Sequence, residues 1–275
     1  MKAVLFFFLA LIPAMAQAGI PRVQRVIHLV FENADYEDVI ANPVFKRVAD
    51  AGVLFTGARA VAHPSQPNYI AMISGSVDGA GSDGEINLSR PHLGDLLEAK
   101  GLQWKVYAEG YPGNCFLPMR SGKYVRRHVP FLSFTNVQRS KERCARIVNA
   151  DGFSGDLQAG KLPEYSLYVP DLDHDGHDTG VEFAGKWFES AFGPVFSNAA
   201  IMESTLFVVT FDESESWFGS NRVYTVLLGA NVRSGLKIGD PVSHYSVLAL
   251  IEDLFRLGNL NRQDRTAAKI PDIWQ

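Results

Sequence analysis

The sequence predicts an α/β domain built around a mostly parallel β-sheet. Several apolar, β-branched runs lack the alternation of a half-exposed strand, which is typical of parallel strands covered by helices on both faces. Helical patterns alternate with these runs along the chain, as in successive βαβ units. The expected strands are residues 25–31, 104–108, 165–169, 205–211 and 223–228.

The segments between the expected strands carry helical periodicity or none. The stretch from residue 110 to 150 has little periodicity and is too long for a plain connection, so we expect it to be an inserted loop or cap. The expected helices are residues 43–51, 68–73, 92–100, 182–192 and 245–257.

Composition indicates a globular enzyme-sized domain. The 275 residues are 47% hydrophobic and 20% charged, which excludes intrinsic disorder and fibrous repeats. With 26 Lys and Arg against 30 Asp and Glu, the net charge is −4, and no basic run is longer than the Arg126–Arg127 pair. A nucleic-acid-binding surface is therefore not expected. Residues 19–275 are expected to form a single catalytic domain.

Residues 1–18 have the pattern of a secretory leader. Lys2 precedes an apolar run at 4–15, and Ala16-Gln17-Ala18 has the small-x-small form of a cleavage site before Gly19. A buried helix or a membrane anchor is the alternative, but the run is too short to span a bilayer and Pro13 interrupts it. We expect a secreted or periplasmic bacterial protein with no transmembrane anchor after leader removal.

Export also bears on the two cysteines, Cys115 and Cys144. An oxidising compartment allows them to pair, and we expect a disulfide that pins the 110–150 segment. Two buried thiols are the alternative. A cysteine metal site is disfavoured because neither residue has further soft ligands nearby.

Acidic and amide side chains follow two of the expected strands. Glu32-Asn33 comes after the first strand and Asp212-Glu213 after the fourth. Ligands in such sheets bind beyond the carboxyl ends of the strands, and converging oxygens favour a divalent cation such as Ca²⁺, Mg²⁺ or Mn²⁺. Either pair alone could instead cap a strand or begin a turn.

Ser65 lies in a Pro-rich turn directly before an expected helix. A hydroxyl there faces free backbone N–H groups and the positive end of the helix dipole, which favours an alkoxide and a bound phosphoryl oxygen. The alternative is an ordinary capping serine. A metal held by nearby carboxylates would activate this hydroxyl without a histidine base.

The most polar segment, residues 170–178, admits three interpretations. It fits the calcium-loop pattern D-x-D-x-D-G-x5-E, although a strand rather than a helix precedes it. A second interpretation uses His177 with Asp173 or Asp175 to bind phosphate or metal, and the third is a solvated acidic loop. The residues that match the calcium-loop pattern are Asp171, Asp173, Asp175, Gly176 and Glu182.

Two further histidines have different expected roles. His244 opens the last long helix, where the dipole favours neutral imidazole, suited to metal ligation or to donation to an oxyanion. Considered alone, it could equally be a plain cap. His28 lies mid-strand among apolar residues and is expected to be a hydrogen-bonded core residue.

These motifs, in this order, resemble a bacterial phosphoesterase family that holds phospholipases C and metal-dependent acid phosphatases, within the alkaline phosphatase superfamily. The resemblance covers about residues 25 to 258 and implies a three-layer sandwich with helices on both faces of the sheet. Its most specific parts are Glu32-Asn33 and the P-S-x-P-N segment. The matching segments are FENADYEDVI, HPSQPNYIAMISG, VPDLDHDGHD, TFDE and DPVSHYSVLALIEDLF.

The resemblance also implies residue roles. Ser65 would be the nucleophile that forms a phosphoseryl intermediate, and Asn68 would hold a phosphoryl oxygen. His177 and His244 would contact phosphate or protonate the leaving group, and His128, ranked below the others, would be brought toward substrate. The implied metal ligands are Glu32, Asn33, Ser65, Asp212 and Glu213.

The sequence departs from superfamily members that bind two zinc ions. Glu213 follows Asp212 where those enzymes have Asp-His, so one divalent metal is expected, with zinc less favoured. A second site from Asp173, His177 and His244 stays open.

The expected function is an exported, metal-dependent phosphoric-ester hydrolase acting on a small phosphorylated substrate or a phospholipid headgroup. The short chain favours acid phosphatase activity on phosphomonoesters. The alternatives are a phospholipase C or phosphodiesterase and, outside the enzymes, a secreted calcium-binding module.

Overall fold

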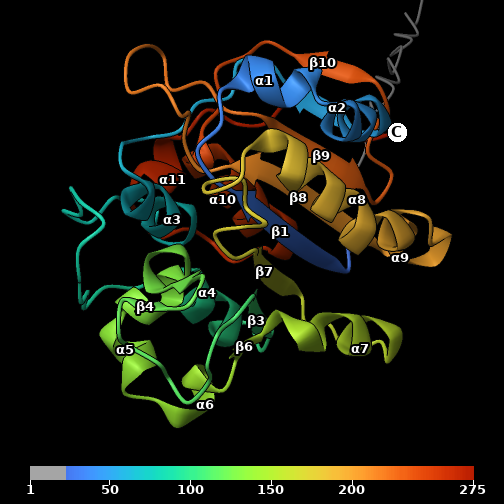
Figure 1. The fold of residues 1–275 in the computed structure, drawn as a ribbon. Helices are drawn as coiled ribbons and strands as arrows, with labels where there is room; N and C mark the ends of the chain where they lie inside the picture. The colour runs from blue at the N-terminus through green and yellow to red at the C-terminus, as the bar shows by residue number, and fades with distance from the viewer. Residues whose placement is uncertain (1–22) are drawn as a thin grey trace, which may run out of the picture.

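The computed structural model describes residues 23–275, so the expected leader at residues 1–18 lies outside the described residues. An eight-stranded sheet occupies the centre, in the order β10-β2-β9-β8-β1-β7-β3-β6 (Figure 1). Its strands are β1 (Arg25–Phe31), β2 (Val53–Phe55), β3 (Trp104–Ala108), β6 (Ile147–Asn149), β7 (Tyr165–Val169), β8 (Thr205–Phe211), β9 (Thr225–Gly229) and β10 (Leu236–Ile238).

The sheet is mostly parallel, as the sequence predicts. Within this eight-stranded sheet, only β9 runs antiparallel to its neighbours β8 and β2. Every residue of β7 and β8 is buried, which explains why these strands read as continuous apolar runs. The register of β1 on β8 pairs Phe31 with Phe211, so both strands end at the same level.

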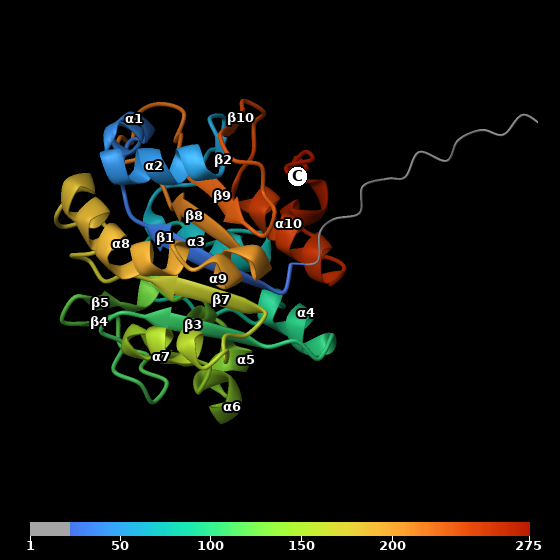
Figure 2. The same cartoon turned by 90° about the vertical axis from the view of Figure 1, so that its right-hand side faces the viewer.

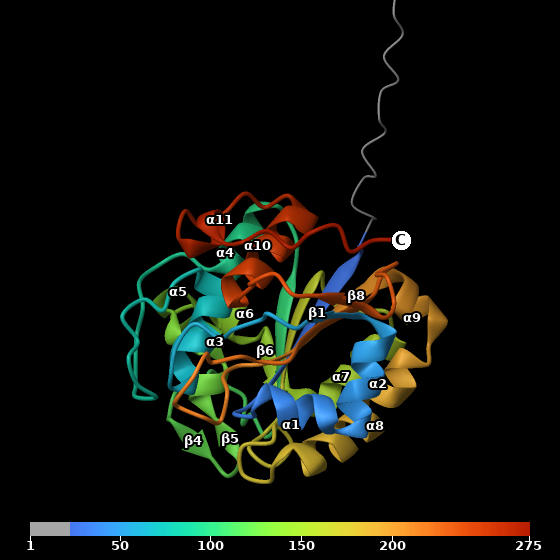
Figure 3. The same ribbon diagram turned by 90° about the horizontal axis from the view of Figure 1, so that it is seen from above.

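Helices cover both faces of the sheet, which confirms the three-layer α/β architecture (Figures 2 and 3). One face carries α3, α4, α10 and α11, and the other carries α1, α2, α7, α8 and α9. These helices are α1 (Tyr36–Ala41), α2 (Pro43–Ala51), α3 (Ser65–Ser74), α4 (Leu93–Ala99), α7 (Phe153–Gln158), α8 (Val181–Phe196), α9 (Ala199–Ser204), α10 (His244–Phe255) and α11 (Gln263–Thr266).

Aromatic side chains fill both layers of the core. Phe31, the last residue of β1, packs edge-on against Phe45 of α2 and Phe188 of α8, at ring-centroid distances of 5.1 and 5.2 Å. Trp104 of β3 stacks on Phe131 at 4.2 Å. The contacts of Phe31 hold α2 and α8 beside the carboxyl end of β1.

The 110–150 segment is folded and joins the sheet through its last residues. It contains the β4 (Arg120–Ser121) and β5 (Tyr124–Val125) hairpin, 3₁₀ turns, α5 (Thr135–Gln138), α6 (Lys141–Cys144) and the edge strand β6. The predicted disulfide between Cys115 and Cys144 is present.

Some boundaries differ from the prediction. Helix α3 begins at Ser65 rather than residue 68, because Pro67 is tolerated in the first turn of a helix. Helix α8 continues to Phe196 through Pro194, and β9 begins two residues late. Among residues 23–275, no helix is long and apolar enough to cross a membrane.

Candidate active site

The site begins where two neighbouring parallel strands end. Glu32 and Asn33 follow β1, and Asp212 and Glu213 follow β8. The backbone N–H of Asp212 donates to the carbonyl of Phe31 at 2.9 Å, and the N–H of Asn33 donates to Asp212 Oδ1 at 3.2 Å. The strand register therefore brings the two predicted pairs together.

Ser65, the first residue of α3, lies between the two pairs. Its Oγ is 2.9 Å from Glu32 Oε2, 3.1 Å from Glu213 Oε1 and 3.4 Å from Asn33 Oδ1. One hydroxyl proton can serve only one of these acceptors at a time. Two segments that are distant in sequence from Ser65 thus converge on its hydroxyl oxygen, which the sequence predicts to be the nucleophile.

The carboxylates around Ser65 are strongly desolvated. Glu32 and Asp212 are 0% exposed and Glu213 is 1% exposed. Burial raises the pKa of Glu32, and burial together with the charges of Glu32 and Glu213 raises the pKa of Asp212 well above its usual value. Burial likewise raises the pKa of Glu213 to about 8. Such a cluster is costly unless a cation accompanies it.

This donor set fits a divalent cation. Asp212 Oδ2 is buried and has no hydrogen-bond partner among residues 23–275. Carboxylate, amide and hydroxyl oxygens are the ligands that Ca²⁺, Mg²⁺ and Mn²⁺ prefer. The residues that would hold the ion are those the sequence nominates: Glu32, Asn33, Ser65, Asp212 and Glu213.

His128 lies inside the site, although the sequence gives it the lowest rank. It is 1% exposed, its Nε2 is 3.2 Å from Glu32 Oε1, and its Nδ1 is 3.6 Å from Asp175 Oδ2. Its ring stacks on Tyr69 at 4.9 Å. Burial lowers the pKa of His128 well below its usual value, so the ring is neutral at neutral pH.

His63 is a site residue that the sequence reasoning missed. Its Nδ1 pairs with Glu213 Oε2, and its ring stacks on Trp217 at 5.0 Å. Its position two residues before Ser65 was the available signal. The sequence offers Asp175 as a calcium-loop residue or as a partner of His177, whereas the structure shows it 0% exposed and facing His128.

Asn68 organises the turn before Ser65. It is 0% exposed, and its Oδ1 accepts from the N–H groups of Val61 and Ala62, both at 3.0 Å. Its Nδ2 donates to the carbonyls of Ala62 and Pro64 at 2.9 and 3.2 Å. Backbone groups therefore engage both the oxygen and the nitrogen of its amide, and the expected phosphoryl contact stays a prediction.

The structure does not bring Asp173, His177 and His244 together as one metal site. His244 Nε2 lies 2.6 Å from the backbone carbonyl of Asp212, and burial lowers the pKa of His244 to about 4. A neutral His244 thus donates to this carbonyl and positions the end of β8. His177 Nδ1 is 2.9 Å from Asp178, and Asp173 Oδ1 is 2.6 Å from Lys123.

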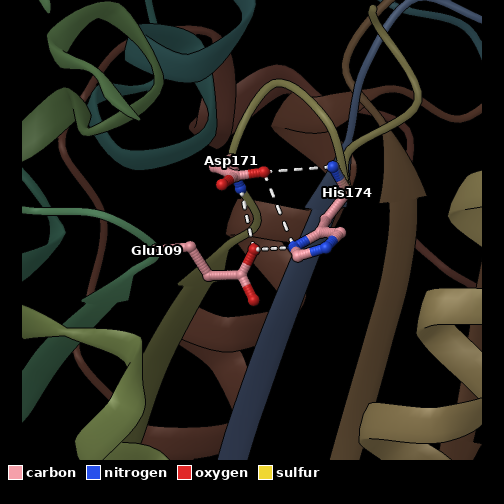
Figure 4. A group of neighbouring side chains, drawn as sticks. All are labelled: Glu109, Asp171 and His174. Carbon is pink, nitrogen blue, oxygen red and sulfur yellow. Dashed lines mark hydrogen bonds and ion pairs between the residues drawn. The ribbon is translucent and has the colours of Figure 1, made fainter. Parts of the chain in front are cut away.

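A different trio gathers at the loop after β7. Ligand atoms of Glu109, Asp171 and His174 lie within 4.8 Å of one another, and no other His, Cys, Asp or Glu trio in residues 23–275 is as compact (Figure 4). His174 Nδ1 lies 2.7 Å from Glu109 Oε2. The five calcium-loop residues do not share one centre, since Asp175 faces His128 while Glu182 pairs with Lys186 on α8.

His28 is a core residue, as predicted. It is 1% exposed, and its Nδ1 is 3.2 Å from the Tyr165 hydroxyl. Burial, with a contribution from His244, lowers its pKa to about 3. It faces no group of the Ser65 cluster.

Comparison with known proteins gives one consistent family. The model of the Phosphoesterase family matches residues 30–258. A probable acid phosphatase from Kluyveromyces lactis is 34% identical over 89% of this chain, which spans 61% of that protein. A phosphatidylinositol-3-phosphatase from Mycobacterium tuberculosis is 30% identical over 94% of this chain and 86% of its own length.

Solved structures support the fold. A protein of the alkaline phosphatase superfamily from Vibrio parahaemolyticus superposes with a TM-score of 0.60 at 12% identity, over 92% of this chain and 69% of that one. The architecture expected from the motifs is therefore confirmed.

Proposed function

The chain belongs to the Phosphoesterase family, and from this membership and the site geometry we propose that it is a metal-dependent phosphoric-ester hydrolase of acid phosphatase type. The observation that carries the proposal is the convergence of Glu32, Asn33 and Glu213 on the Ser65 hydroxyl at the carboxyl edge of the sheet. The identity to acid phosphatases supports the same class.

The chemistry proceeds in two displacements at phosphorus. Ser65 Oγ forms a bond to phosphorus while the bond to the leaving alcohol breaks, and the hydroxyl proton passes to a neighbouring carboxylate. The alcohol departs with the electron pair and takes up a proton. Water then attacks phosphorus and gives up a proton, the bond to Ser65 breaks, Ser65 Oγ takes up that proton, and inorganic phosphate is released.

The groups around Ser65 position the hydroxyl and the carboxylates, and a bound cation would offset their negative charge. A divalent cation, when bound by the five oxygen donors, supplies the charge that acidifies the hydroxyl and polarises the phosphoryl group. Asn68 holds the turn that presents Ser65, and His244 fixes the carbonyl of Asp212. His63 and His128 lie against Glu213 and Glu32, where they restrain the carboxylates.

A phosphodiesterase or phospholipase C activity is the second candidate. Trp217 stacks on His63 and is 63% exposed, and Phe218 beside it is 94% exposed. Exposed aromatic residues next to a phosphoryl site suit an apolar substituent on the substrate.

Activity outside the cytoplasm is part of the proposal, and the Cys115–Cys144 disulfide supports it.

The test is turnover of an aryl phosphate monoester and an aryl phosphodiester, each with and without a chelator. We expect faster turnover of the monoester and loss of both activities after chelation, restored by Mg²⁺, Mn²⁺ or Ca²⁺ better than by Cu²⁺. Faster diester turnover would favour the second candidate. Calcium binding without any ester turnover would favour a calcium-binding module.

A further inference from the structure

Two adjacent arginines near the site have opposite environments. Arg126 is 3% exposed, and its guanidinium donates to the carbonyls of Ile86, Leu117 and Leu132. These bonds make it a structural residue. Arg127 has one weak ion pair, from its Nε to Asp83 Oδ2 at 3.5 Å. That Nε is buried and has no hydrogen-bond partner among residues 23–275.

Asp83 connects Arg127 to the first turn of α3. While one carboxylate oxygen faces Arg127, the other accepts the backbone N–H of Gln66 at 3.0 Å. Gln66 directly follows Ser65. The carboxylate thus holds the guanidinium next to the helix end that presents the nucleophile.

The charge of Arg127 reaches the carboxylates on Ser65. Arg127 directly precedes His128, whose Nε2 lies 3.2 Å from Glu32 Oε1. The carboxylates of Glu32 and Glu213 lie within hydrogen-bond distance of Ser65 Oγ. The guanidinium is therefore within electrostatic range of the atom that would attack phosphorus.

A positively charged side chain near Ser65 would offset the negative charge that a phosphomonoester adds to the site. A phosphomonoester dianion would bring two more negative charges beside buried Glu32, Asp212 and Glu213. His63 Nδ1 and His128 Nε2 already pair with Glu213 and Glu32. A guanidinium stays charged at all relevant pH and can donate two parallel hydrogen bonds to phosphoryl oxygens.

We propose that Arg127, held by Asp83, binds the non-bridging phosphoryl oxygens and makes the site select dianionic monoesters over monoanionic diesters. This inference rests on the proposed function. A monoester offers one more anionic oxygen than a diester. Removing the guanidinium should therefore lower kcat/KM more for the monoester than for the diester.

The experiment compares R127Q, R127K and D83N with wild type. R47Q is the matched control, because Arg47 pairs with exposed Glu189 on α2 and α8, away from Ser65. For each protein, kcat/KM is measured for an aryl phosphate monoester and an aryl phosphodiester. Calorimetry measures the affinity for inorganic phosphate, and thermal unfolding checks the fold.

For R127Q we expect kcat/KM for the monoester to fall about 100-fold, the effect of removing one hydrogen-bond donor to the transition state. For the diester we expect a fall of less than about tenfold. Phosphate affinity should fall at least about tenfold. Monoester kcat/KM and phosphate affinity should fall less in R127K and D83N than in R127Q. Both quantities should match wild type in R47Q. Unfolding temperatures should be unchanged.

Equal losses for both esters, or undiminished phosphate binding by R127Q, would overturn the role of Arg127 while leaving the proposed function standing. Wild-type protein that turns over neither ester with metal present would instead contradict the proposed function, and the inference with it.

Discussion

We expect metal binding to depend strongly on the Asp212 side chain. It is fully buried, one of its oxygens accepts from the Asn33 N–H, and the other has no partner among the described residues. We predict that D212N weakens Mn²⁺ binding at least about tenfold, because a neutral amide replaces an anionic ligand. Titration calorimetry with Mn²⁺ measures this.

The control for D212N is D171N, which alters the compact trio at Glu109 and His174 instead. Its amide oxygen can still accept the N–H groups of residues 173 and 174, as the carboxylate does. We expect D171N to bind Mn²⁺ and to hydrolyse ester as wild type does. Loss of the activating metal from D171N but not from D212N would move the metal site to the loop after β7.

Glu252 gives a pH dependence that is independent of the active site. It is 2% exposed in α10, and burial together with the charge of Asp264 raises its pKa to about 8. The folded state therefore binds this proton more tightly than the unfolded state does. Its contribution to stability is complete below about pH 4.5, the ordinary value, and is lost as pH rises toward 8.

We predict that E252Q removes this dependence. The variant should gain stability relative to wild type between pH 5 and pH 8, by on the order of 1 kcal/mol per pH unit. Denaturant unfolding across this range measures the difference. D253N, which alters an exposed neighbour paired with Lys269, is the control. Parallel curves for E252Q and wild type would show that Glu252 is ionised in the folded protein.

At the scale of the elements, the turn into α3 determines where Ser65 lies. Replacing Asn68 by Ala would leave the backbone partners at residues 61, 62 and 64 without their hydrogen bonds. We predict that N68A loses about 2–4 kcal/mol of unfolding free energy as well as activity. Full stability combined with a fall in kcat/KM would point instead to the phosphoryl contact that the family resemblance implies.

The disulfide stabilises the segment that carries His128. Cys115 and Cys144 are 29 residues apart, and closing such a loop contributes about 3–4 kcal/mol in the chain-entropy model. Reduction should lower the unfolding temperature more than it lowers kcat. Unfolding with and without reductant, together with a count of alkylatable thiols, checks this. Unchanged stability after complete reduction would contradict it.

The elements show which features sequence patterns can predict. The buried strands β1, β3, β7 and β8 were predicted at their observed bounds, because a run of five or seven mostly apolar residues is a strong signal. The short strands β2, β6 and β10 have three residues each and are too short to show periodicity. Tertiary pairing determines them.

The site was predicted to a similar extent. Glu32, Asn33, Ser65 and Glu213 converge as expected because their positions follow from strand ends and a helix start. The roles of Asn68 and His244 depend on which backbone groups lie within reach, and no motif encodes that. Arg127 and His63 were missed because their environments arise from segments distant in sequence.

At the scale of the whole molecule, the fold brings together three segments that are far apart in the chain. Residues 32–33, 65 and 212–213 meet only when β1 and β8 pair in register and α3 packs at the edge of the sheet. The central claim is that this assembly makes Ser65 the nucleophile. The claim can be tested by trapping the phosphoenzyme.

The most direct measurement is rapid quenching of the metal-loaded enzyme during turnover of an aryl phosphate, in parallel with acid, which preserves phosphoserine, and with alkaline denaturant, which preserves phosphohistidine, followed by peptide mass spectrometry. Covalent phosphate should be found on Ser65 in wild type, and S65A should show none and should not turn over, although its fold is intact. Phosphate on a histidine, or wild-type-like turnover by S65A, would contradict the account.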